Sequence, residues 1–174
     1  MKLLIRPAAE VAIKSKPVRR QQMRHLRQNI RKLLARLDDD IHVEGSWDRV
    51  DVAIPDGRGL AGPVIDELGR IPGISTIQEI GVFPWISMDD VAEQAVAAYA
   101  DRIRGKTFAV RVRRHGNHGF RSIDLERFVG AALFEASEPE GVNLRNPDIE
   151  VRIEVHEDHY HIAHRKHRGA GGYP

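Results

Sequence analysis

The stretch from Phe108 to Gly130 changes its hydrophobic period from two residues to about 3.6, and this change fixes a strand, a loop and a helix in succession. In residues 108–113 apolar side chains alternate with others, which predicts a half-buried strand with Arg111 and Arg113 on its outer face. From Ser122 the apolar residues fall at helical spacing, so a helix is expected with Ser122 as its N-cap.

The loop between these elements, residues 114–121, has the composition of an anion-binding surface. Two glycines and an asparagine let its backbone amides point outward, and the start of the following helix adds a positive field. Between Arg102 and Arg121 there are seven Lys/Arg and no Asp or Glu, so phosphate is the expected ligand. The predicted RNA-binding residues here are Arg111, Arg113, Arg114, His115, Asn117, His118, Arg121 and Ser122.

A second basic segment lies near the N-terminus. Ser15 or Lys16 before Pro17 marks a helix start. Residues 1–36 hold 11 Lys/Arg against one acid, so pairing within the helix cannot neutralise its charge. We expect RNA to contact this segment, although a solvated helix face is the alternative. Its expected apolar stripe is Met23, Leu26, Ile30, Leu33 and Leu37, and its expected RNA-facing residues are Lys14, Arg20, Arg24, Arg27 and Arg31.

The totals exclude several classes of protein. The net charge of +2 conceals an acidic middle segment, residues 37–100, with 3 Lys/Arg against 13 Asp/Glu. The absence of cysteine excludes disulfides, thiolate metal sites and thiol chemistry in this chain. No apolar run approaches the roughly 20 residues that cross a bilayer, and the first residues do not resemble a secretory signal. A cytoplasmic protein without a membrane partner is expected.

The order of the expected elements predicts an α+β chain of two domains. Residues 1–82 read as β-α-β-β-α-β, the ferredoxin-like arrangement. The rest is expected to contain a link at Phe83-Pro84-Trp85, a helix capped by Ser87, and the strand 149–155 with its partner 159–164. Trp47, in the turn of the first hairpin, is expected to be a packing residue. The predicted domains are 1–82 and 83–168, with a glycine-rich linker at 169–174.

No self-sufficient active site is visible. A Rossmann fingerprint, a nucleotide P-loop and a nucleophile elbow are all missing from the sequence. His159 and His161 share a strand face in a histidine-rich segment, which raises a metal site as one interpretation. The spacing matches no standard zinc pattern, so we favour surface or RNA-facing histidines and assign neither metal ligands nor catalytic residues.

Several motifs carry a family resemblance over nearly the whole chain. They are Trp47-Asp48-Arg49-Val50, Ile71-Pro72-Gly73-Ile74, the run Arg114-x-Gly116-x-His118-x-Phe120-x-Ser122-Ile123-Asp124, and the closing Gly169-Ala170-Gly171-Gly172-Tyr173-Pro174. In this order they resemble the N-terminal region of the bacterial tRNA 4-thiouridine synthetases, or tRNA sulfurtransferases. His115 stands where relatives commonly place Arg or Lys, so that contact is expected to be weaker or to depend on pH.

The resemblance implies a ferredoxin-like domain followed by an α/β THUMP domain that holds the acceptor stem and single-stranded 3′ tail of tRNA. The family's ATP-dependent uridine thiolation, which also serves thiamine biosynthesis, belongs to a further C-terminal domain with a catalytic cysteine. ATP and magnesium are therefore expected only there, with no cofactor in this chain. A cysteine desulfurase partner is expected only for the full-length enzyme, and a homodimer stays open. The alternative is a stand-alone RNA-binding or protein-interaction module, the latter using residues 37–100.

Overall fold

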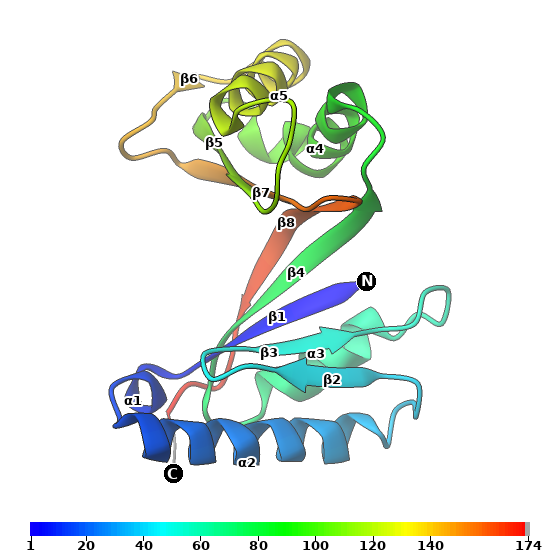
Figure 1. Cartoon of the computed structure of the whole chain (residues 1–174), viewed down its shortest axis with the longest axis vertical. Coiled ribbons are helices and arrows are strands. Elements are labelled where there is room, and N and C mark those ends of the chain that lie inside the picture. Colours follow the sequence, from blue (N-terminus) through cyan, green and yellow to red (C-terminus); the bar gives the residue numbers. More distant parts are fainter. Residues whose placement is uncertain (173–174) are drawn as a thin grey trace. The chain divides into compact units, whose positions relative to one another are not determined.

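The computed structural model describes residues 1–172 and divides the chain into two compact units. Unit 1 comprises residues 1–80 together with the chain from Arg165 onward, and unit 2 comprises residues 81–164. Two long strands, β4 (Ile74–Pro84) and β8 (His159–Arg168), run from one unit into the other (Figure 1).

Unit 1 has the predicted ferredoxin-like order, with one added turn of helix. Its four strands form an antiparallel sheet in the order β2-β3-β1-β4. The segment after Pro7 forms the short helix α1. The elements are β1 (Lys2–Pro7), α1 (Ala9–Ala12), α2 (Lys16–Leu34), β2 (His42–Gly45), β3 (Val50–Ala53) and α3 (Ala61–Gly69), followed by β4.

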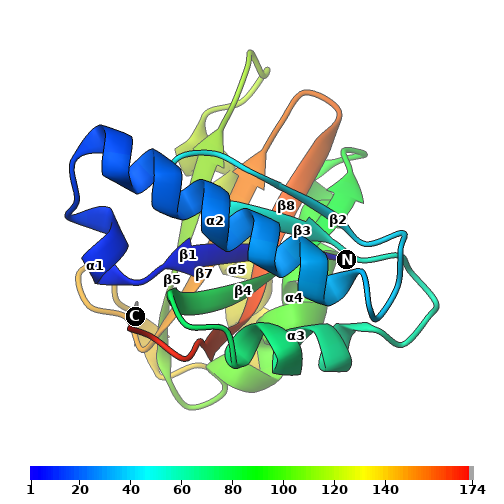
Figure 2. The same ribbon diagram turned by 90° about the horizontal axis from the view of Figure 1, so that it is seen from below.

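The core of unit 1 lies between its sheet and the helices α2 and α3, which run side by side over the same face (Figure 2). Met23, Leu26 and Ile30 of α2 are buried, as predicted. The expected end of that stripe is wrong, because α2 stops at Leu34, which is fully buried, whereas Leu37 follows the helix and is 40% exposed. Loss of the helical period after Leu34 turns Leu37 away from the sheet.

Unit 2 has four strands in the order β8-β7-β5-β6, with β5 parallel to β7 and to the very short β6, and β7 antiparallel to β8. Residues 141–142 pair with the start of β5. Helices α4 and α5 lie over one face of the strands (Figure 1). The elements are α4 (Met88–Ile103), β5 (Thr107–Arg114), α5 (Ser122–Ser137), β6 (Gly141–Val142) and β7 (Ile149–Val155), with β8 last.

The two faces of the unit 2 sheet differ in character. Val110, Ile153 and Tyr160 point toward α4 and α5 and are buried. The alternate residues, including Arg111 and Glu154, lie on the opposite face and are only partly buried. Strand alternation therefore places the charged and histidine side chains of three strands on one surface.

Two helix and strand boundaries position this sheet. The Ser87 hydroxyl accepts a hydrogen bond from the Asp90 amide at 3.2 Å, which confirms the predicted cap of α4. Phe83 and Pro84, in the predicted link between the domains, continue strand β4, and the rings of Phe83 and Trp85 pack against the unit 2 core. The packing of these rings favours an extended chain through Pro84, although a proline often marks the end of a strand.

The glycine-rich end, expected as a linker, returns to unit 1 as far as it is described. The Gly169 amide donates to the Ser75 carbonyl at 2.9 Å, and the Gly171 amide donates to that of Ile74 at 2.8 Å. A Cβ atom at Gly169 would overlap the Ile74 backbone, so only glycine allows this approach. Tyr173 and Pro174 lie outside the described residues.

Candidate nucleic-acid interface

Arg114, predicted as a phosphate contact, holds the 114–121 loop together. Its guanidinium donates to the Phe120 carbonyl and, at 3.2 Å, to the Ser122 hydroxyl. The predicted Ser122 cap is wrong, because Ser122 is the first residue of α5 and Arg121 is the N-cap residue. The tertiary contact from Arg114 takes the hydroxyl that a local cap would have used.

Arg121 is paired with its own helix. The Asp124 carboxylate accepts from the Arg121 amide at 2.9 Å and from its guanidinium at 3.0 and 3.2 Å. The side-chain hydrogen bond from Arg121, followed by the backbone one, lowers the pKa of the Asp124 carboxyl, and the same bond raises the pKa of Arg121. The positive end of α5 therefore already holds an anion, which a phosphate would have to displace.

Arg111 and Arg113, neighbours on the outer face of β5, differ in their partners. Arg111 donates to the Leu144 carbonyl and lies 3.9 Å from the Glu150 carboxylate. Arg113 is exposed and forms no ion pair with any of residues 1–172, although the parallel register places it opposite Glu154. Arg113 is thus the arginine of β5 most available to a phosphate.

The loop tip, Asn117 and His118, rests on an aromatic base. The ring of Trp85 stacks on that of Phe120 with centroids 5.2 Å apart, and the His118 ring lies 5.4 Å from Phe120. The His118 Nε2 is 2.9 Å from the His115 carbonyl, while Asn117 is exposed. Phe120 anchors the loop, and its partner Trp85 was missed by the sequence analysis, since 35 residues separate the two and no local pattern joins them.

His115 points away from this tip toward β7. Its Nε2 lies 2.8 Å from a carboxylate oxygen of Glu154, and its ring stacks on His156 at 4.6 Å. Burial by itself would raise the pKa of the Glu154 carboxyl, but the His115 hydrogen bond and the nearby imidazoles outweigh it and lower that pKa. The eight predicted residues of this segment, named here the loop surface, all lie in unit 2, and several of them are already engaged in contacts within that unit.

The α2 surface, defined as Lys14, Arg20, Arg24, Arg27 and Arg31, has a different pattern. Its exposed members Lys14, Arg20 and Arg24 form no ion pair with any residue of the described chain. Arg27 and Arg31 donate to carbonyls of the edge strand β2, at 2.8 Å to Gly45 and 2.7 Å to Val43. Because a carbonyl oxygen carries no net charge, these hydrogen bonds do not neutralise the positive charge of the two guanidinium groups.

The C-terminal half of α2 and the strand β2 line a polar hollow beside this surface. The hollow is lined by both arginines together with Glu44, Ser46, Arg49 and Asp51. Trp47, expected to be a packing residue, is 54% exposed, and the Arg19 guanidinium lies 4.4 Å from its ring centroid. The hairpin turn projects the indole out of the core, so the aromatic ring stands among the cations of unit 1.

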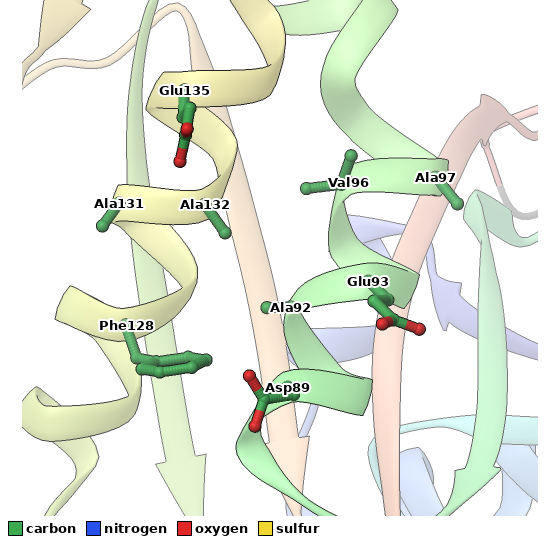
Figure 3. Close-up of a pocket in the computed structure, with 9 residues that line it drawn as sticks. All are labelled: Asp89, Ala92, Glu93, Val96, Ala97, Phe128, Ala131, Ala132 and Glu135. Carbon is green, nitrogen blue, oxygen red and sulfur yellow. The ribbon is translucent and has the colours of Figure 1, made fainter.

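A groove between α4 and α5 has the opposite charge. Phe128, Ala92 and Ala132 line it, and the carboxylates of Asp89 and Glu135 lie along it (Figure 3). Phe128 is 40% exposed, because it faces this groove. The acidic rim makes the groove unsuited to a phosphate backbone.

Two family models match the chain, one for each unit. The THUMP domain model matches residues 86–165, and the ThiI ferredoxin-like domain model matches residues 2–77. The chain is therefore a THUMP-domain protein whose first unit is a ferredoxin-like domain. These two domains, together with a curated relative that is 76% identical over the whole chain, match the N-terminal region of tRNA sulfurtransferases, which confirms the resemblance seen in the motifs.

Curated relatives match over the full chain. The tRNA sulfurtransferase of Marinobacter nauticus is 76% identical over 174 residues, and those of Pseudomonas aeruginosa and Shewanella woodyi are 40% and 39% identical. In each case the match covers 100% of this chain and 36% of the relative. The chain thus spans about a third of the length of these proteins.

Solved structures share the fold. A protein of Pyrococcus horikoshii matches with a TM-score of 0.72 at 23% identity, covering 100% of this chain and 57% of that one. A 4-thiouridine synthetase solved as an RNA complex with bound ATP matches with a TM-score of 0.71 at 21% identity, covering 100% and 43%. Among residues 1–172, no helix is long and apolar enough to cross a membrane.

Proposed function

We propose that this chain binds the acceptor stem and 3′ tail of tRNA and positions them for thiolation by a catalytic region of the whole protein. The main observation in support is the α2 surface, whose arginines and lysine form no ion pair with a carboxylate of the described chain. Uncompensated cations release the counterions of a nucleic acid when they bind it, and this supplies affinity. The family of the chain and the RNA complex of its structural neighbour support the same function.

The two surfaces would divide the work. The α2 surface neutralises phosphates of the stem, which fixes orientation without reading sequence. On the loop surface, Arg113 contacts a phosphate directly, whereas Arg111 and Arg121 must first leave Glu150 and Asp124. Exposed ion pairs contribute only about 0–1 kcal/mol, so a polyanion can replace them.

The loop tip suits an unpaired nucleotide. Asn117 offers a donor and an acceptor, and His118 presents an imidazole backed by the Trp85–Phe120 stack. Single-stranded RNA is recognised by stacking on such rings and by hydrogen bonds to base edges. The 3′ tail is therefore assigned to this tip.

The remaining parts of the proposal concern the whole protein. The name of its relatives supports a transfer of sulfur to tRNA by the whole protein. The use of ATP and magnesium, a cysteine desulfurase as sulfur donor and a cytoplasmic location are proposed from the family resemblance alone. In this chain we assign neither catalytic residues nor a cofactor. The chain alone is accordingly proposed to bind tRNA without modifying it.

Titration of the 174-residue chain with labelled acceptor-stem minihelices tests the proposal. We expect affinity to fall steeply between about 50 and 200 mM salt and to fall further when the single-stranded tail is removed. Equal affinity for tailed and tail-less RNA would contradict the role of the loop tip. Thiolation or ATP turnover by the chain alone would contradict a purely binding role.

A further inference from the structure

Three histidines of the β7–β8 hairpin and one from the end of β5 meet on the outer face of the unit 2 sheet. The β7–β8 hairpin turns through Glu157 and Asp158, and the His156 amide donates to the His159 carbonyl at 2.9 Å. The next pair on the same face is Glu154 opposite His161. Strand alternation therefore puts His156, His159 and His161 on one surface, and His115 enters from β5 beside them.

The rings are close enough to share a ligand. The centroid of His156 lies 4.5 Å from that of His159 and 4.8 Å from that of His161, and His159 lies 5.0 Å from His161. One nitrogen from each ring lies within 4.8 Å of the other two. Rotation about χ1 and χ2 can bring such nitrogens to the roughly 2.0–2.1 Å of a zinc–imidazole bond.

Carboxylates next to the rings favour this use. Asp158 Oδ1 lies 2.5 Å from Nδ1 of His159, which leaves Nε2 of that ring for a metal. A carboxylate that holds the second nitrogen of a ligating imidazole is the usual outer partner in histidine metal sites. His115, Glu154 and His156 form a second group within 4.8 Å, so a carboxylate oxygen is also at hand.

We propose that His156, His159 and His161 bind one divalent transition-metal ion, of the zinc, nickel or copper class, through three imidazole nitrogens. Nitrogen donors with an adjacent carboxylate suit these borderline ions rather than magnesium or calcium. Glu154, opposite His161, is placed to complete the coordination. The proposal does not depend on tRNA binding, because its three ligands belong to neither the α2 surface nor the loop surface.

Metal titration of tag-free protein tests the site. Calorimetry with ZnCl2 should give one ion per chain, and His156→Ala combined with His159→Ala should weaken binding on the order of 100-fold. The matched control combines His25→Ala with His42→Ala, two exposed histidines of unit 1, and should leave binding unchanged. Equal affinity in wild type and the His156/His159 variant would overturn the proposal, as would loss of binding in the control.

Cobalt provides a readout that does not depend on affinity alone. Co2+ bound by histidine nitrogen should give visible d–d absorption without thiolate charge-transfer bands, since the chain has no cysteine. His161→Gln, a milder change, should reduce that absorption while circular dichroism and the melting temperature in metal-free buffer stay as in wild type. Absorption equal to that of free Co2+ at saturating protein would rule out the site.

Discussion

The α2 surface and the loop surface are both rich in cations, but only one of them keeps its charge uncompensated. On α2, Arg27 and Arg31 end on neutral carbonyls, and Arg20 and Arg24 meet no acid in the described chain. On the loop, Arg121 and His115 each contact a carboxylate. A helix can repeat one charge sign along a face, as α2 does, whereas the loop surface meets carboxylates from the first turn of α5 and from the neighbouring strand β7.

The α2 surface and the loop surface are held in place by different kinds of contact. The α2 surface is held by a buried helix stripe and by hydrogen bonds to an edge strand, which also cover strand groups that could pair with another chain. The loop surface is held by polar and aromatic contacts that use its own predicted binding residues. We infer that α2 supplies general affinity and the loop supplies placement.

The largest expected effect comes from the aromatic base of the loop. Trp85→Ala removes the stack on Phe120 and the edge contact to Tyr160, so stability should fall by about 2–3 kcal/mol for this half-buried ring. Chemical denaturation of the chain measures it. Trp47→Ala, at an indole 54% exposed in unit 1, is the matched control and should cost far less. Similar losses for both variants would show that the loop needs no such base.

The second effect tests the uncompensated charge. Arg20→Ala with Arg24→Ala should weaken binding of an acceptor-stem RNA by about tenfold and reduce the salt slope by about 2, since each lost phosphate contact removes about one unit. Arg70→Ala, an exposed arginine of unit 1 beside Glu67, is the control. If the control and the double variant lose equal affinity, the α2 surface has no special role.

A third variant tests the hydrogen bond from Arg27 of α2 to the edge strand β2. Arg27→Ala deletes the half-buried bond to the Gly45 carbonyl, and we expect a loss of about 1 kcal/mol in unfolding free energy. Binding of RNA should weaken as well, because the same guanidinium carries charge. Arg27→Lys keeps the charge but not the fork geometry, so it should recover RNA affinity more fully than stability. Recovery of both to the same extent would contradict the dual role.

The smallest effect concerns Asp124. Asp124→Asn frees Arg121 and should raise RNA affinity by about two- to threefold if an exposed pair of this kind competes with phosphate. The pKa of this carboxyl is lowered in the folded chain, so its contribution to stability is present above its unfolded value and is lost as the pH falls through its folded value. The acid limb of the stability profile should therefore flatten in the variant, and an unchanged limb would argue against the pair.

Much of the fold follows from local patterns. The Ser15 and Pro17 signals gave the start of α2, the alternation in 149–155 gave β7, and Ser87 gave the cap of α4. The predicted βαββαβ order of unit 1 holds because each element carries its own period. Boundaries failed where the signal was weak or shared, as at Leu37 and Pro84.

Local sequence patterns predicted only part of the candidate site. Residue type and spacing marked Arg111, Arg113, Arg121 and the α2 arginines as cations on exposed faces. Pairing of Arg111 with Glu150, the support of Phe120 by Trp85 and the gathering of His115 with the hairpin histidines join residues that are distant in sequence. Periodicity reports which way a side chain points, not what meets it there.

The sequence by itself determined the element order, the two basic segments and the family, because these depend on periods and motifs within about 20 residues of chain. The tertiary structure alone decided which cations stay uncompensated and which histidines lie together. In unit 2 the strand register decides which carboxylates face the cations and which histidines lie together. A shift by one residue would send Glu154 and His156 to the buried face. That register depends on contacts between β5, β7 and β8 that no single segment encodes.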